Sequence, residues 1–343
     1  MKISIVIVTH NREALLKECL NSIVKQLKVK GLKASFETIV VFNGGNKSEL
    51  DQREILCLTS YNIRKSSPSS ARNFAIKKCS GEYILFIDDD TKLCSNYLLN
   101  SLNFIDEYRP DIFGGSDKEY SNSGIFERSI NFALRSPLVT AQTSNRHNQN
   151  IREHFQANEK HLTLSNLWFK SSLFKQGHQF NPHFYRNEEN ILISQIAKHS
   201  ALIFFVPKLC VEHRRRSKLK NFFYPSYYSG YYRMKTFFNY PTQFSLVFIL
   251  PVICLVISPL LLLMSPYLLG SLALIYLCLL TFFTLKISLS NQSYKCIIPL
   301  FFLQPIILIS YSLGSLVSIL LNTGSRLLVY TNTPKRKSNE TPI

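Results

Sequence analysis

The sequence has few acidic residues, no closely spaced pair of cysteines and a long stretch without any charged residue. None of its eight cysteines belongs to a Cys-x-x-Cys pair, which argues against a disulfide framework and a zinc site. Unpaired thiols are typical of a reducing compartment. The amino terminus, Met1 to Val6, is too short an apolar run for a secretory signal. We therefore expect the first part of the chain to stay in the cytosol.

The charge balance is strongly basic, with 40 Lys and Arg against 22 Asp and Glu. Only 18% of residues are charged and 46% are hydrophobic, a combination typical of a membrane protein with a basic cytoplasmic face. Many basic residues precede the first long apolar stretch, and each contributes about 1 kcal/mol to attraction by anionic membrane lipids. They are Lys208, Arg214, Arg215, Arg216, Lys218, Lys220, Arg233 and Lys235. Since no nucleic-acid motif accompanies them, we expect no nucleic-acid partner.

The stretch from Phe244 to Leu285 contains no charged residue. Ser265-Pro266 divides it into two runs of about 20 residues, the length that crosses a bilayer. A third uncharged run extends from Cys296 to Ser325, so we expect two or three membrane spans within 244–325. None of these runs carries an ionisable residue that would mark a transport path. Three crossings would place the basic tail, 326–343, outside the cell, although basic residues favour the cytoplasmic side. A re-entrant run and an overridden charge bias both remain possible.

Residues 1–207 alternate between strand-like and helix-like patterns, which predicts a doubly wound α/β domain. Residues 208–243 mix aromatic and basic side chains, as interfacial connectors do. The predicted strands are Ile3–Val8, Phe36–Phe42, Ile55–Leu58 and Tyr83–Ile87, and the predicted helices are one capped by Asn11 and one over Ser69–Cys79. The ends of such strands form a nucleotide crevice. The polar stretch 143–161 is either a loop over that crevice or a surface insertion.

Three consecutive carboxylates, Asp88, Asp89 and Asp90, directly follow the apolar strand Tyr83–Ile87. Crowded carboxylates repel one another unless a cation neutralises them, and oxygen ligands on a short loop suit Mg²⁺ or Mn²⁺. A solvated acidic turn is the alternative interpretation. The first strand lacks a Gly-x-Gly-x-x-Gly turn, which argues against a dinucleotide oxidoreductase.

The opening strand Ser4–Arg12, the segment Ala71–Tyr83 and Asp88-x-Asp90 follow one another along the chain. In this order they resemble the motifs of a family 2 glycosyltransferase of the GT-A fold, and the resemblance extends over about residues 1–240. Further on, Arg186–Asn190 resembles an Arg-Asn-Glu-Asp segment of membrane-bound exopolysaccharide enzymes of the succinoglycan type. The Tyr-Gly-containing stretch Tyr228–Arg233 resembles their connector.

This resemblance implies a role for each matching residue. Asp88 would contact the nucleotide and the metal, and Asp90 would bind the metal that bridges the diphosphate. Glu189 stands at the position of the catalytic base, where the family has Asp, with Glu188 beside it; a solvated helix start is the alternative for this acidic pair. The remaining residues implied in nucleotide-sugar binding are Thr9, Asn11, Arg12, Asn43, Arg72, Asp89 and Arg216.

Two further positions qualify these expectations. Phe42 stands where the family usually has an Asp that hydrogen-bonds the nucleotide base, so base recognition would shift to Asn43, Arg72 or the backbone. A uridine nucleotide is still expected. His213 is a candidate contact to the metal or to phosphate, with a surface histidine as the alternative.

Together these features predict an inverting, metal-dependent hexosyltransferase. It would move sugar from a nucleotide-diphosphate sugar, expected to be a UDP-sugar, to a polyprenyl-linked or other saccharide in surface or exopolysaccharide biosynthesis. The resemblance implies a multi-pass protein of the inner (plasma) membrane with a cytoplasmic catalytic domain. The alternatives are a polyprenyl-phosphate sugar synthase, whose acceptor needs no general base, and a non-catalytic sugar-nucleotide-binding scaffold. A processive synthase is disfavoured, since no Gln-x-x-Arg-Trp segment is present and Trp168 is the only tryptophan.

Overall fold

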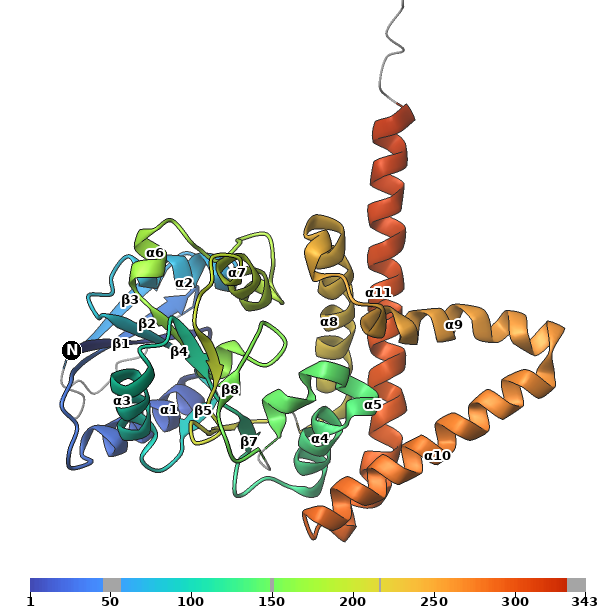
Figure 1. Cartoon of the computed structure of the whole chain (residues 1–343), viewed down its shortest axis with the longest axis horizontal. Helices are drawn as coiled ribbons and strands as arrows, with labels where there is room; N and C mark the ends of the chain where they lie inside the picture. Colours follow the sequence, from blue (N-terminus) through green and yellow to red (C-terminus); the bar gives the residue numbers. More distant parts are fainter. Residues whose placement is uncertain (46–56, 149–150, 216, 332–343) are drawn as a thin grey trace, which may run out of the picture.

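A computed structural model describes residues 1–45, 57–148, 151–215 and 217–331. It consists of a mixed α/β domain followed by long apolar helices (Figure 1). Four parallel strands form one half of the main sheet, in the order β3-β2-β1-β4. They are β1 (Lys2–Thr9), β2 (Ser35–Asn43), β3 (Leu58–Ile63) and β4 (Tyr83–Asp88). Their carboxyl ends meet at one edge of the sheet, as the alternating sequence pattern predicts.

The other half of the main sheet is built from short strands and begins with β9, which runs antiparallel to β4. The order continues β9-β6-β10-β8. These strands are β6 (Ile112–Gly114), β8 (Phe155–Gln156), β9 (Leu167–Lys170) and β10 (Ile203–Phe205). The sheet is therefore mixed rather than wholly parallel, which the sequence pattern did not indicate.

Side chains along each central strand alternate between two hydrophobic cores. Ile3, Ile5 and Ile7 of β1 pack with helices α1 (Glu13–Leu27) and α3 (Tyr97–Tyr108). On the opposite face, Val6 and Phe86 pack with α2 (Pro68–Ile76) and α7 (Glu188–Ala197). Because both faces are covered, the strands read as continuous apolar runs. The short elements α6 (Ser172–Lys175), η1 (Ala141–His147) and η2 (Leu164–Asn166) complete the domain.

A second, three-stranded sheet lies next to the acidic turn, in the order β5-β11-β7. Its strands are β5 (Thr91–Leu93), β7 (Asp117–Glu119) and β11 (Val211–His213). β11 pairs antiparallel with β5, so that His213 lies opposite Thr91. This pairing brings a residue from near the end of the domain to the acidic turn.

Three helices are long and apolar enough to cross a membrane. α9 (Leu246–Met264) ends and α10 (Pro266–Ser290) begins at the Ser265-Pro266 pair, as the sequence predicts. The third is α11 (Ile297–Thr331), which is preceded by η4 (Tyr294–Cys296). The described part of the basic tail ends at Thr331. Large apolar side chains on α9 and α10 are exposed, as expected for lipid-facing helices.

The α/β domain is joined to the apolar helices through α4 (Ile125–Arg135), α5 (Pro137–Thr140) and α8 (Leu219–Asn239), with η3 (Pro241–Gln243) leading to α9. α8 lies along α11 (Figure 1). At their crossing, a Cβ on Gly230 would lie 2.0 Å from the Tyr311 carbonyl, so only glycine permits this approach. On α4, Arg135 donates to Asn291 at 2.9 Å, which ties the α/β domain to the loop between α10 and α11.

One local prediction was wrong. Helix α1 begins at Glu13 after Arg12, and Asn11 does not cap it but adopts a left-handed φ of 53°. That turn of the chain lets Arg12 reach the acidic residues. The third strand was expected at 55–58, of which 55 and 56 lie outside the described residues, and the structure describes β3 over Leu58–Ile63. β3 is an edge strand in which only Leu58 is buried, so its polar residues conceal it from a search for apolar runs.

Candidate active site

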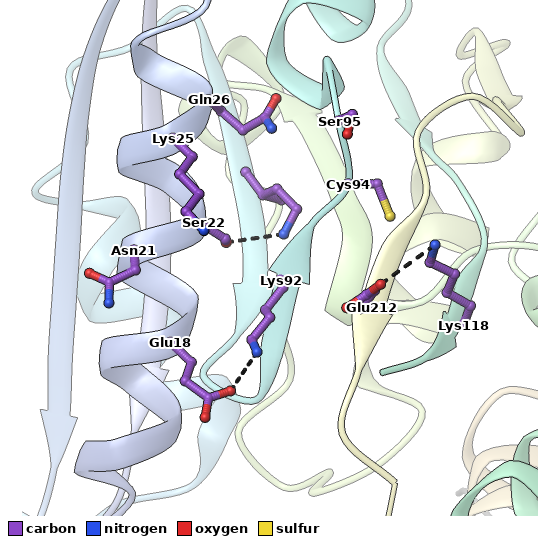
Figure 2. A pocket seen from close by; sticks show the side chains of 11 residues that line it. Glu18, Asn21, Ser22, Lys25, Gln26, Lys92, Cys94, Ser95, Lys118 and Glu212 are labelled. Atoms are coloured by element: carbon purple, nitrogen blue, oxygen red, sulfur yellow. Dashed lines mark hydrogen bonds and ion pairs between the residues drawn. The ribbon is translucent and has the colours of Figure 1, made fainter. Parts of the chain in front are cut away.

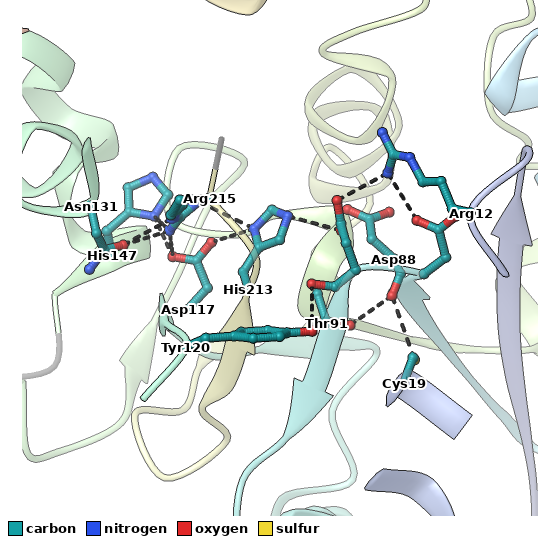
Figure 3. Close-up of polar contacts among 12 residues, drawn as sticks. Arg12, Cys19, Asp88, Thr91, Asp117, Tyr120, Asn131, His147, His213 and Arg215 are labelled. Carbon is teal, nitrogen blue, oxygen red and sulfur yellow. Dashed lines mark hydrogen bonds and ion pairs between the residues drawn. The ribbon is translucent and has the colours of Figure 1, made fainter. Parts of the chain in front are cut away.

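The acidic turn after β4 is tightly held by its own backbone contacts. The carbonyl oxygen of Asp88 accepts a hydrogen bond from Thr91 Oγ1 at 2.8 Å and a weaker one from the Cys19 thiol at 3.7 Å. Figure 3 shows Asp88 of this turn with Thr91 and Cys19. The backbone of the turn is therefore fixed, and the partners of each carboxylate decide its orientation.

Asp89 is the most buried of the three, with 4% of its surface exposed. Its carboxylate accepts hydrogen bonds from Thr9 Oγ1 at 2.7 Å and from Arg12 Nη1 at 3.0 Å. Burial raises the pKa of Asp89, while Arg12 and Thr9 oppose that rise. Arg12 also donates to Asp90 at 3.0 Å. Thr9, Arg12 and Asp89 thus form a support that orients the turn from the end of β1.

Asp90 and Asp88 share a small cluster with His213, in which one donor atom from each residue lies within 4.8 Å of the others. His213 Nε2 is 3.1 Å from Asp90 Oδ1. Two carboxylate oxygens and an imidazole nitrogen are ligands that suit Mn²⁺ or Mg²⁺ and leave further positions for phosphate and water. The residues present therefore fit a divalent cation.

Asp117 on β7 orients His213 from the far side of the ring (Figure 3). Its carboxylate lies 3.2 Å from His213 Nδ1 and also contacts His147 and Arg215, the latter at 2.7 Å. Such a carboxylate behind a histidine sets which nitrogen faces the metal. Burial opposes ionisation of Asp117, but Arg215 and His147 hold its pKa well below the ordinary value.

Without a bound cation, the surroundings of His213 favour the protonated imidazole. Burial lowers the pKa of His213, but Asp90 and Asp117 outweigh that effect and raise it to about 10. Since a metal ligand must be the neutral imidazole, metal binding at this position is expected to release a proton.

Arg72 on α2 joins the acidic turn to the second acidic motif. Its Nη1 donates to Glu188 Oε1 at 2.9 Å, and its Nη2 lies 3.4 Å from Asp88 Oδ1. The Arg72 side chain is only 11% exposed. Two carboxylates that are a hundred residues apart in the sequence thereby lie around one guanidinium group.

Glu188 and Glu189 occupy the first turn of α7, and both are buried. Burial and the neighbouring Glu189 charge raise the pKa of Glu188 to about 7, against the attraction of Arg72. Glu189 lies 3.8 Å from Arg146 Nη1, too far for a hydrogen bond. Arg146 instead donates to Asn190 Oδ1 at 2.7 Å and to backbone carbonyls of the 159–160 turn. It therefore fixes the start of α7 beside Glu189.

Asn11, Asn43 and Arg216 are the other sequence-predicted residues, and no contact of theirs with this cluster is described. Asn43 accepts hydrogen bonds from Ser66 and donates to its carbonyl, which braces the end of β2 against the segment before α2. Asn11 occupies the left-handed turn described above. Arg216 lies outside the described residues. The nucleotide contacts suggested for these three residues remain predictions.

No motif in the sequence indicates Asp117, His147 or Arg146 as site residues. Each lies in the stretch 114–179, where the periodicity is weak and no motif marks it. Part of the polar stretch 143–161 is buried against the site. The side chain of Arg146 is 11% exposed and that of His147 is 13% exposed. The described part of that stretch is therefore more than a surface insertion. Asp117 lies on β7 and His147 at the end of η1, so the two become recognisable as partners only in the folded structure.

A model of glycosyl transferase family 2 matches residues 4–178. The chain belongs to this family. A poly(ribitol-phosphate) beta-glucosyltransferase from Bacillus spizizenii is 37% identical over 132 residues, which cover 36% of this chain and 20% of that protein. A GalNAc(5)-diNAcBac-PP-undecaprenol beta-1,3-glucosyltransferase from Campylobacter jejuni is 24% identical over 216 residues, or 59% of this chain and 62% of that protein. The matches thus span less than two thirds of either relative.

Among solved structures, a mannosyltransferase from Pyrobaculum calidifontis in complex with GDP-Man and Mn²⁺ resembles the chain with a TM-score of 0.58. The match covers 92% of this chain and 86% of that structure at 13% identity, so it bears on the fold. The GT-A-like α/β fold expected from the sequence is confirmed, and so is membership in the glycosyltransferase family.

Proposed function

We propose that this family 2 glycosyltransferase moves sugar from a nucleotide-diphosphate sugar to a lipid-linked saccharide, with inversion at the anomeric carbon. The supporting observation is the bridge that Arg72 makes between Asp88 and Glu188. It places the acidic turn suited to the donor's diphosphate beside the acidic pair suited to activating an acceptor. A donor and an acceptor bound at these two motifs would meet at one point.

On the donor side, Asp88, Asp90 and His213 would hold Mg²⁺ or Mn²⁺. A cation there would neutralise the charge that develops on the departing diphosphate. Arg12 keeps Asp90 and Asp89 in fixed orientations, and Asp117 does the same for His213. We expect a uridine nucleotide, with Asn43, Arg72 or backbone groups in place of the base contact that Phe42 cannot make.

On the acceptor side, Glu189 would act as the general base. Its carboxylate accepts the proton of the acceptor hydroxyl while that oxygen bonds to the anomeric carbon and the bond to the diphosphate breaks. Glu188 is less suited to this role, because Arg72 already occupies one of its oxygens at 2.9 Å. Glu188 would instead position Arg72 and the start of α7.

The membrane part would bring a lipid-linked acceptor to this site. α9, α10 and α11 are each long enough to cross a bilayer, and α8 leads into them from the residues next to the site. Aromatic residues and basic Lys235 on α8 are typical of the head-group level. The Campylobacter jejuni relative is named for an undecaprenol-linked substrate, which supports the same acceptor class. We therefore propose a plasma-membrane enzyme with its catalytic domain, 1–207, in the cytoplasm.

The test is nucleotide-diphosphate release and lipid-linked product formation by membranes that contain the protein, across a panel of nucleotide sugars with Mg²⁺ or Mn²⁺. Glu189→Gln should lower transfer by about 10²- to 10⁴-fold, the usual contribution of a general base, and leave donor binding within twofold. Glu82→Gln is the matched control, since that side chain is 67% exposed and distant from the motif.

Each contrary result has a distinct meaning. Transfer at the parent rate by Glu189→Gln would refute the base assignment and would favour a phosphate acceptor that needs no base. Absence of release from every donor, with lipid extract present, would refute the enzyme proposal in favour of a binding scaffold. Release that persists in Asp90→Asn would refute the metal assignment.

A further inference from the structure

Two cysteines that the proposed reaction does not use lie opposite each other on the small sheet. β5 and β11 pair antiparallel with Leu93 opposite Val211, and the same register places Cys94 opposite Cys210 one step further. The Cys94 amide donates to the Cys210 carbonyl at 3.3 Å, so the ladder continues to this pair. Opposite residues joined by such a hydrogen bond have Cα atoms about 5.5 Å apart. A disulfide spans about 4.4–6.8 Å between Cα atoms, so the separation of this pair lies within that range.

Small molecules have access to one of the two sulfurs. Cys94 lines a cavity of about 720 Å³ between α1 and the small sheet, and Figure 2 shows its thiol near Lys118 and Glu212. Both cysteines are half-buried thiols rather than members of a disulfide in this structure. Hydrogen bonding from the Cys210 thiol lowers the pKa of Cys94, burial raises it, and the Lys118 ammonium adds to the lowering. Cys94 is therefore the better nucleophile of the pair.

We propose that Cys94 and Cys210 form a reversible disulfide by exchange with a small-molecule disulfide such as oxidised glutathione. The Cys94 thiolate attacks one sulfur of that molecule, and the other sulfur leaves as a thiolate that takes up a proton. The Cys210 thiol then loses its proton and attacks the Cys94 sulfur, which releases the second small thiol. Two protein thiols are oxidised and one disulfide is reduced to two thiols, so atoms and electrons balance.

The new bond would join the two strands that carry the proposed metal ligands. Asp90 immediately precedes β5 and His213 ends β11, while the cysteines lie at the opposite end of the same ladder. Oxidation would therefore clamp the pair of strands without touching the carboxylates or the imidazole. The inference depends on the register and on the access of Cys94 to the cavity, and it stands whether or not the proposed sugar transfer is correct.

The test is oxidation of the full chain in detergent with oxidised glutathione, followed by alkylation under denaturing conditions and peptide mapping. Alkylatable thiols should fall from eight to six, with the peptides that contain Cys94 and Cys210 linked, and dithiothreitol should restore all eight. Cys94→Ser should lose the cross-link at least tenfold, whereas Cys57→Ser, which removes an exposed thiol, should retain it.

A second comparison tests the order of attack. With its partner replaced by Ser, Cys94 should form the mixed disulfide with glutathione at least tenfold faster than Cys210 does in the reciprocal variant. Unchanged thiol numbers in the parent protein, or a linkage of Cys94 to any cysteine other than Cys210, would overturn the proposal. Equal rates for the two single thiols would overturn the assignment of Cys94 as the nucleophile.

Discussion

Replacing Glu37 by Gln should destabilise the catalytic domain in a pH-dependent manner. Glu37 lies on β2, and its carboxylate accepts hydrogen bonds from Ser4 Oγ at 2.5 Å and from the amide and hydroxyl of Ser80 at 2.7 and 2.8 Å. The Lys2 ammonium is 2.9 Å away. The carboxylate thus ties together β2, β1 and the segment that leads into β4, which ends at the acidic turn.

The size of the effect follows from the shifted pKa. Burial raises the pKa of Glu37, but hydrogen bonds from Ser4 and Ser80 and the Lys2 contact outweigh it and lower the value from 4.5 to about 2. That difference corresponds to about 3.4 kcal/mol at neutral pH. Because the side chain is 15% exposed and partly solvated, we expect a loss of about 2 kcal/mol for Gln.

The sign of the pH dependence is determined by the lowered pKa. The carboxylate stabilises the folded state fully above pH 4.5, and this stabilisation is lost as the pH falls through about 2. The difference in unfolding free energy between parent and Glu37→Gln should therefore be about 2 kcal/mol at pH 7 and less than half of that at pH 3.

The assay is denaturant unfolding of the detergent-solubilised protein, followed by tryptophan fluorescence. Trp168 is the only tryptophan and is fully buried in β9, so the signal reports on the catalytic domain. Glu82→Gln should change stability by less than about 0.5 kcal/mol, as is usual for exposed charges. A loss below 0.5 kcal/mol for Glu37→Gln at pH 7, or equal losses at pH 7 and pH 3, would refute the reasoning.

Three further predictions concern the site and the helices. Arg72→Met should reduce sugar transfer by about 100-fold, because it leaves buried Glu188 without its hydrogen-bond partner at 2.9 Å. Steady-state kinetics on membranes measure this loss, and a loss below tenfold would contradict the prediction. Gly230→Ala should lower the thermal unfolding temperature by several degrees, because its Cβ would lie 2.0 Å from a carbonyl of α11. Gly270→Ala is the control, because a Cβ at that position would have no neighbouring atom within 4 Å. Equal shifts of the unfolding temperature in the two variants would count against the packing argument. A chelator should abolish nucleotide release and Mn²⁺ should restore it in the parent but not in Asp90→Asn; full activity in chelator would exclude the metal role.

The central strands and the apolar helices are recognisable from the sequence because the signal is local. Continuous apolar runs at Ile3–Val8 and Tyr83–Ile87 correspond to β1 and β4, and the carboxylates that follow mark the edge of the sheet. The uncharged stretch divided at Ser265-Pro266 corresponds to α9 and α10 in the same way. In each case the apolar pattern extends over enough consecutive residues that a single polar residue within it does not conceal the element.

The short and antiparallel elements are not recognisable in this way. β6, β9 and β10 have three or four residues each, too few for a period to be seen, and they are strands because neighbours distant in sequence supply their hydrogen bonds. The same holds for β3, which is identified by its pairing with β2 rather than by its composition.

The acidic turn Asp88–Asp90 and the acidic pair Glu188–Glu189 are recognisable from the sequence as candidate groups for the chemistry. Their partners depend on the folded arrangement of the chain. Asp89 is tied to Thr9 and Arg12, Asp90 faces His213, and Glu188 meets Arg72. These partners lie between 77 and 123 residues away along the chain, a separation at which no local pattern carries information. The sheet brings them together because its parallel strands end at one edge, where charges from distant segments must neutralise one another once they are buried.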